Sequence, residues 1–108
     1  MTSIERFGIY WFDPEPVRGS EIKKIRPCVV VSPGVMNNSL QTVIIAPLTT
    51  VIRPWSFRVN VKVLGRSSSV ACDQIRAVDK SRLKEQIDKL PKLDGEKILA
   101  ILKLIFEY

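Results

Sequence analysis

The chain has 108 residues, 45% of them apolar and 26% charged, a balance typical of a single soluble domain that spans residues 1–108. Its 17 Lys and Arg against 11 Asp and Glu give a net charge of +6. This excess favours a polyanionic partner such as nucleic acid, although a basic surface without a partner has the same composition. The absence of histidine excludes a His-based triad, a pair of catalytic histidines and a histidine-containing zinc site.

The positive charge is concentrated in residues 51–92, which hold ten basic and four acidic side chains. The two cysteines, Cys28 and Cys72, lie in separate apolar runs without a CxxC spacing, so we expect reduced, buried thiols. The N-terminal residues lack the pattern of a signal peptide, and the longest apolar run, residues 98–102, is too short to span a membrane. These features predict a cytoplasmic protein with no membrane contact.

The first two thirds of the chain show short β-type runs separated by Pro, Gly, Asn and Ser. Residues 7–13 predict a first strand, and residues 14–25 a long loop of the kind that often carries function. The apolar run 27–32 predicts a strand buried on both faces, and residues 37–39 a loop or short helical turn. Residues 42–47 predict another buried strand, which we expect to end at Pro47 because proline lacks a backbone donor.

Residues 57–63 have the clearest alternation, with apolar Phe57, Val59, Val61 and Val63 separated by polar side chains. A turn at residues 64–66 and a returning strand at 69–74 complete a predicted hairpin.

The last third changes to helical spacing. Asp79 or Ser81 is a candidate cap for a short helix through Asp88, and Asp94 is the predicted N-cap of a terminal helix. Apolar residues on more than one side of that helix predict burial against the sheet and a partner subunit. The predicted class is α+β, a small, strongly bent antiparallel sheet or barrel with helices late in the chain.

Three polar segments interrupt the β half. Arg26 precedes Pro27, which biases it toward extended geometry at the start of a strand. Thr49 and Thr50 end the segment 46–50, and residues 73–76 (DQIR) combine a carboxylate, an amide and a guanidinium. Taken singly, these are explained as an exposed arginine, a strand end and a turn network. Together, at one edge of a barrel, they would suit RNA phosphodiester cleavage, because guanidinium groups match phosphate oxygens.

The chain resembles the MazF/PemK/Kid toxins along essentially its whole length. The resemblance rests on blocks in matching order and spacing: residues 8–11 (GIYW), 19–21 (GSE), 26–27 (RP), 29–32 (VVVS), 37–38 (NN), 46–50 (APLTT), 73–76 (DQIR), 78–79 (VD) and 82–83 (RL). It implies a small SH3-like antiparallel β-barrel with a long C-terminal helix and one or two short helices.

The resemblance also implies a function. Such toxins are sequence-specific endoribonucleases of type II toxin–antitoxin modules that cut single-stranded RNA or mRNA and so inhibit translation and growth. They use the ribose 2′-OH as nucleophile, leave 2′,3′-cyclic phosphate and 5′-OH ends, and need no metal or cofactor. The implied partners are RNA, a second copy of the chain as a homodimer, and an acidic, partly disordered cognate antitoxin, with which such toxins bind DNA.

The family's catalytic arginine and threonine correspond to Arg26 and Thr49. The segments matching the RNA groove contain Gly19, Ser20, Gln74 and Arg76, and the neighbouring Lys24 is a further RNA-binding candidate. Some relatives have histidine at the position of Ser20 and arginine at that of Ala71, so their acid–base assignment does not transfer.

Cleavage without histidine still requires a base for the 2′-OH, stabilisation of the phosphorane and an acid for the departing oxygen. Arg26 suits the second task and can donate toward the leaving oxygen, but its pKa above about 12 makes it a poor base. Glu21 and Asp73 are the candidate bases, with Glu21 preferred because its loop adjoins Arg26. Arg53 and Trp55 are further RNA-binding candidates, and Trp55 would stack on a base or else be a core or interface residue.

Two other functions are compatible with this fold. A toxin of the same fold can bind DNA gyrase without cutting nucleic acid, and an inert barrel can bind RNA. The presence of both Arg26 and Thr49 favours the nuclease.

Overall fold

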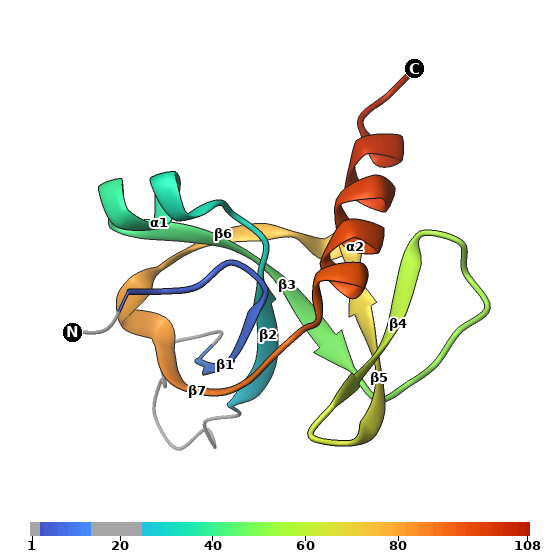
Figure 1. Cartoon of the computed structure of the whole chain (residues 1–108), viewed down its shortest axis with the longest axis horizontal. Helices are drawn as coiled ribbons and strands as arrows, with labels where there is room; N and C mark the ends of the chain where they lie inside the picture. Colours follow the sequence, from blue (N-terminus) through green and yellow to red (C-terminus); the bar gives the residue numbers. More distant parts are fainter. Residues whose placement is uncertain (1–2, 14–24) are drawn as a thin grey trace, which may run out of the picture.

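The computed structural model describes residues 3–13 and 25–108, which form an antiparallel sheet, two α-helices and two short 3₁₀ turns (Figure 1). The elements are β1 (Gly8–Phe12), β2 (Arg26–Val30), α1 (Gly34–Ser39), β3 (Thr42–Thr49), β4 (Arg58–Val63), β5 (Arg66–Ala71), η1 (Cys72–Gln74), β6 (Arg76–Asp79), η2 (Lys80–Arg82), β7 (Leu83–Lys89) and α2 (Lys92–Ile105).

The strands follow the order β4–β5–β3–β2–β1–β7, and β6 pairs with β3 beside this path. All of these pairings are antiparallel, and the sheet curls into a half-barrel next to α2 (Figure 1). The predicted α+β class, with a small bent antiparallel sheet and a C-terminal helix, is confirmed.

Strand β3 connects the two parts of the curled sheet. Residues 42–45 pair with β6 and residues 45–47 with β2, whereas Leu48 and Thr49 pair with Val70 and Ser69 of β5. The prediction that this strand ends at Pro47 is wrong, because β3 continues to Thr49. One edge of β3 pairs with β2 up to Pro47, while on its other edge the partner changes from β6, whose pairing ends at Ile45, to β5, whose pairing begins at Leu48. Pro47, which lacks a backbone N–H, therefore lies between the β6 and β5 pairings.

The predicted hairpin is confirmed as β4 and β5, with a tighter turn than expected. Leu64 and Gly65 both have positive φ, 51° and 80°, as a two-residue hairpin turn of the primed type requires. Arg66 therefore already belongs to β5, which ends at Ala71, and residues 72–74 form η1 instead of extending the strand.

The short helix predicted through Asp88 is wrong, because residues 83–89 form strand β7 along β1. The Asp88 carboxylate (Oδ2) accepts a hydrogen bond at 2.8 Å from the backbone N–H of Leu64, which ties β7 to the β4–β5 turn. Asp79 does act as a cap, accepting from the N–H of Ser81 at 2.8 Å, but the element that it caps is the 3₁₀ turn η2.

Helix α2 begins at Lys92, so the predicted N-cap at Asp94 is wrong, and Asp94 lies in the first turn. The N–H of Gly95 donates to the carbonyl of Pro91 at 3.1 Å, which starts the helix earlier than the side-chain pattern suggested. Ile98 is fully buried against the sheet, whereas Phe106, just beyond the helix, is 72% exposed. Within the chain, the sheet therefore covers the first part of α2 and leaves its C-terminal end open.

The core has two clusters, on opposite faces of β2. Val29 belongs to the cluster beneath α2, whereas Cys28 and Val30 belong to the other. The expectation of a strand buried on both faces is thus confirmed. Cys28 and Cys72 are free and buried, as predicted, and burial raises the pKa of their thiols to about 12 and about 11.

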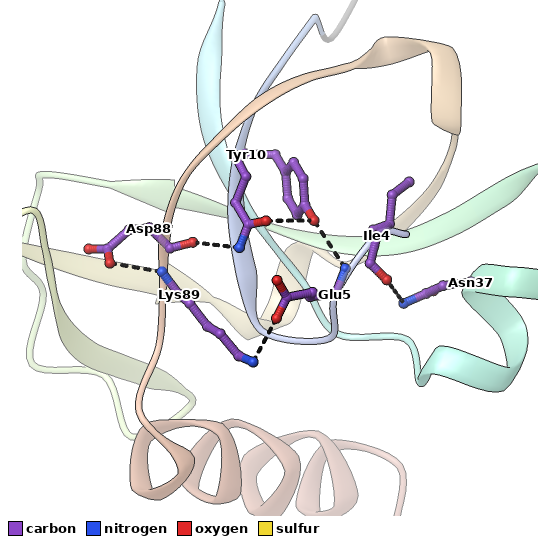
Figure 2. A network of polar contacts seen from close by, with 7 residues as sticks. Ile4, Glu5, Tyr10, Asn37, Asp88 and Lys89 are labelled. Carbon is purple, nitrogen blue, oxygen red and sulfur yellow. Dashed lines mark hydrogen bonds and ion pairs between the residues drawn. The ribbon is translucent and has the colours of Figure 1, made fainter. Parts of the chain in front are cut away.

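Hydrogen bonds and an ion pair connect the N-terminal segment to the sheet and to α1 (Figure 2). The N–H of Glu5 donates to the Tyr10 hydroxyl at 3.0 Å, and the Glu5 carboxylate pairs with Lys89 Nζ at 2.6 Å. The buried Asn37 donates through Nδ2 to the carbonyl of Ile4 at 3.4 Å.

Neither helix in the described part of the chain is long and apolar enough to cross a bilayer.

Candidate functional site

A groove of about 370 Å³ lies between the start of β2, the end of β3, the start of β4, the end of β5 and η1. It is lined by Arg26, Pro47, Leu48, Thr49, Val51, Arg53, Trp55, Arg58, Ala71 and Gln74. Three of these residues are arginines and none is acidic, so the groove offers cationic groups to an anionic ligand.

Strand register explains why Arg26 and Thr49 share this groove. Cys28 pairs with Pro47 in the antiparallel β2–β3 ladder. Moving two residues outward along each strand brings Arg26, the first residue of β2, level with Thr49, the last residue of β3. Residues level with each other across an antiparallel pair point to the same face of the sheet.

The Thr49 hydroxyl is held by the chain that follows it. Its Oγ1 accepts a hydrogen bond from the backbone N–H of Val51 at 3.1 Å. Because a hydroxyl has one donor and two acceptor positions, the Thr49 O–H stays available to donate into the groove. Thr49 can therefore supply a neutral donor next to the Arg26 guanidinium.

Aromatic and cationic side chains meet in the segment between β3 and β4. The rings of Trp55 and Phe57 stack with centroids 5.4 Å apart. The guanidinium carbons of Arg53 and Arg58 lie 5.4 Å and 4.8 Å from the centroid of the Trp55 ring. Trp55 is 42% exposed, so it is a surface residue of this chain and not part of its core.

Arg58 and Asp73 form a two-pronged ion pair beside the groove. Nε of Arg58 donates to Oδ1 of Asp73 at 2.8 Å, and Nη2 donates to Oδ2 at 3.3 Å. These hydrogen bonds stabilise the ionised carboxylate and hold the pKa of Asp73 below its ordinary value. Asp73 is therefore a weaker base than an unpaired aspartate.

The structure brings most of the described candidate residues to this one place. Arg26, Thr49, Arg53, Trp55 and Gln74 line the groove, and Asp73 is bound to its wall through Arg58. Arg76 begins β6, opposite Ile45, and is exposed outside the groove lining. The remaining candidates lie outside the described residues: Gly19, Ser20, Glu21 and Lys24.

Sequence reasoning missed Arg58 as a site residue. The alternation of residues 57–63 assigned it to an outward polar face, yet its side chain is only 9% exposed. The available signal was a pair of opposite charges, Arg58 and Asp73, at facing ends of the predicted hairpin.

Two other depressions offer less to an anionic ligand. One of about 450 Å³ is lined by Trp11, Ile25, Lys84 and Glu85, which carry one positive and one negative charge. Another, of about 270 Å³, lies between β4 and the start of α2 and includes Asp94. Among residues 3–13 and 25–108, no three His, Cys, Asp or Glu side chains are grouped as metal ligands.

Comparison with known proteins gives one consistent family. Residues 5–106 match the model of the PemK-like, MazF-like toxins of type II toxin–antitoxin systems. A curated relative, the endoribonuclease MazF of Staphylococcus epidermidis, is 34% identical over 104 residues, which cover 91% of this chain and 84% of the relative.

Solved structures agree with this match. A crystal structure of MazF from Deinococcus radiodurans has a TM-score of 0.80 at 25% identity and covers 97% of each chain. A MazE–MazF crystal structure from the same organism has a TM-score of 0.84 at 25% identity, covering 97% of this chain and 96% of the other. Family model, curated relative and solved structures together establish that the chain belongs to the PemK/MazF family of toxins of type II toxin–antitoxin systems.

Proposed function

We propose that this toxin is a sequence-specific endoribonuclease that cleaves single-stranded RNA by attack of the ribose 2′-OH, without a metal ion, and thereby inhibits translation. The observation that carries the proposal is the meeting of Arg26 and Thr49 in one cationic groove. The name of the curated relative, an endoribonuclease, supports the same activity.

In the proposed reaction, the 2′-oxygen forms a bond to phosphorus while the bond between phosphorus and the 5′-oxygen breaks. The 2′-proton passes to a base and a proton reaches the departing oxygen, so the products are a 2′,3′-cyclic phosphate and a 5′-OH end. In this scheme Arg26 stabilises the negative phosphorane and donates toward the leaving oxygen. Thr49 donates its O–H to a phosphate oxygen, since Val51 N–H already occupies one of its acceptor positions.

Glu21 is the base in this scheme. The candidate bases in this chain without histidine are two carboxylates, and the pairing of Asp73 with Arg58 lowers the basicity of one of them. Glu21→Gln should lose activity and change the pH profile. Full activity with an unchanged profile would exclude Glu21 from this role.

Gln74, Arg53 and Trp55 are proposed to contact RNA around the scissile phosphate. An exposed aromatic ring beside cationic groups suits a splayed base, which stacks at about 1–3 kcal/mol per base in single-stranded complexes. Gly19, Ser20, Lys24 and Arg76 are proposed to extend these contacts beyond the groove.

The proposed partner proteins are a second copy of the chain, as a homodimer, and an acidic antitoxin segment that covers the basic groove in the cytoplasm. The related Deinococcus structure is a complex of MazF with MazE, which supports an antitoxin partner. Failure of a neighbouring antitoxin to suppress toxicity on co-expression would argue against this mode of inhibition.

The decisive experiment incubates wild type, Arg26→Ala and Arg66→Ala with a long single-stranded RNA in EDTA and maps the new ends. Arg66 is an exposed arginine at the β4–β5 turn and serves as the matched control. We expect cuts by wild type and Arg66→Ala only, with cyclic phosphate ends, and resistance at 2′-deoxy positions. No cutting by folded wild type would refute the nuclease and favour a non-catalytic toxin that binds DNA gyrase or an inert RNA-binding barrel.

A further inference from the structure

Arg58 is a nearly buried cation whose position is fixed from two sides. Its guanidinium is bound edge-on by the Asp73 carboxylate through Nε and Nη2. The same guanidinium lies over the ring of Trp55, with 4.8 Å between Cζ and the ring centroid. A side chain with 9% exposure that is held in this way loses little further freedom when it binds a ligand.

No described residue binds the other edge of the Arg58 guanidinium. Arginine presents N–H donors on two edges, and Asp73 occupies the edge formed by Nε and one hydrogen of Nη2. Within residues 3–13 and 25–108, Arg58 makes no other hydrogen bond, so Nη1 and the second hydrogen of Nη2 stay available. Arg58 lines the groove that also contains Arg26 and Thr49. A planar pair of N–H donors at such a place matches two oxygens of a phosphate.

The Asp73 carboxylate does not neutralise the groove. It approaches Arg58 from outside the lining, whose described residues include Arg26 and Arg53 as further cations and no acidic side chain. A carboxylate bound behind a guanidinium orients it, whereas a general base must face the proton that it removes. The geometry therefore suits Asp73 for positioning Arg58.

We propose that Arg58, positioned by Asp73 and Trp55, binds a second phosphate of the RNA strand, next to the one that Arg26 and Thr49 engage. This inference rests on the proposed function and deepens it. It gives the groove two guanidinium groups with separate tasks, one for the reacting phosphate and one for holding the strand.

Salt dependence of binding tests this proposal without requiring cleavage. The probe is a single-stranded 2′-O-methyl RNA of mixed sequence, and the variants are Arg58→Gln, Arg58→Lys and the control Lys62→Gln. Lys62 lies on the same strand and the same outward face, but outside the groove lining, where its Nζ donates to Ser67. Each phosphate contact to a single strand contributes about 0.7 to the slope of log K against log salt.

We expect Arg58→Gln to bind about 10- to 100-fold more weakly at low salt and to lower the magnitude of that slope by about 0.7. Arg58→Lys, which keeps the charge but loses the fork, should keep the wild-type slope and bind more weakly. Lys62→Gln should behave as wild type. A wild-type slope in folded Arg58→Gln would overturn the proposal. An altered cleavage motif of that variant with an unchanged slope would do so as well, because Arg58 would then contact a base and not a phosphate.

Asp73→Asn separates positioning from acid–base catalysis. Loss of a general base lowers kcat by about 100-fold or more, whereas loss of a positioning contact chiefly raises KM. We expect a raised KM, a kcat within a few-fold of wild type and an unchanged pH profile; a collapse of kcat would assign the base to Asp73 and refute the positioning role. If wild type cuts no RNA yet Arg58→Gln lowers the slope, the second phosphate site stands and the nuclease does not.

Discussion

The packing of α2 on the sheet allows one stability prediction to be worked out from distances. Gly95 lies in the first turn of α2, directly against the ring of Phe7. A methyl group at residue 95 would be 2.5 Å from Cε2 and 2.6 Å from Cδ2 of that ring. Phe7 cannot simply retreat, because its N–H donates to Val30 at 2.6 Å and its carbonyl accepts from Leu90 at 3.0 Å.

Two opposing effects set the size of the change in Gly95→Ala. Replacing glycine by alanine inside a helix stabilises it by about 1 kcal/mol. Overpacking a well-filled core costs about 1–3 kcal/mol. Since the added atom would meet a ring on a doubly hydrogen-bonded backbone, we take the upper half of that range. The expected net loss is about 1–2 kcal/mol, a fall in Tm of about 4–15 °C.

Thermal and urea unfolding of wild type, Gly95→Ala and Gly34→Ala measure this effect. Gly34 opens helix α1, and a methyl group there would meet nothing within 4 Å. Gly34→Ala should be neutral or more stable by up to about 1 kcal/mol. A Gly95→Ala protein as stable as wild type would refute the close approach of Phe7 and α2, and an equal loss in both variants would show a general intolerance of alanine.

Three further predictions concern single side chains. Thr49→Val should lower kcat/KM by about 10- to 100-fold because it removes a donor to phosphate, while Thr49→Ser should stay within a few-fold of wild type. RNA cleavage kinetics measure both, and a fully active valine variant would contradict the role of Thr49 as a phosphate donor. Cys28 and Cys72 should resist alkylation of the native protein at about pH 8, because their raised pKa values leave almost no thiolate; rapid labelling, followed by mass spectrometry, would contradict their burial. The Asp73 pKa is lower in the folded state than the ordinary value of about 3.9, so its pairing with Arg58 stabilises the protein fully above about pH 4 and is lost as pH falls through the folded pKa. The free energies of unfolding of wild type and Asp73→Asn, measured in urea, should therefore differ near neutral pH and converge in acid. The difference should be modest because the carboxylate is partly exposed. A difference that does not change with pH would exclude this linkage.

The strands that were clear in the sequence are those whose pattern reflects burial directly. The apolar run before Ser32 is buried on both faces, and the alternation after Phe57 follows an inside and an outside. Residues 83–89 were wrongly predicted as helical because Leu83 and Ile87 lie four residues apart among good helix formers, a spacing that fits a helix. In the fold these two residues pack against different core clusters, and pairing with β1 overrides local preference.

The sequence predicted those site residues that are marked by adjacent residues in the chain. It did not predict those whose place depends on contacts between distant parts of the chain. Arg26 stands out because Pro27 follows it, and Thr49 because it follows a predicted buried strand; the resemblance to the toxin family implies the catalytic role of both. In the sequence, Arg58 resembles any other outward-facing residue of a strand. Its contact with Asp73 forms only when β4 pairs with β5 and η1 turns back toward β4. Opposite charges at the ends of a hairpin are too common to single out such a pair.

The division of the groove between strands and a connecting segment has an evolutionary consequence. Arg26 and Thr49 stand on β2 and β3, whose alignment is fixed by a ladder with buried residues on both faces. Inserting one residue within β3 would turn Thr49 toward the opposite face, so selection must hold that strand's length constant. Residues 50–57 carry Arg53 and Trp55 outside any ladder. Insertions and deletions there leave the strand pairing intact, so this segment can vary in length and sequence among relatives while β2 and β3 keep Arg26 and Thr49 aligned.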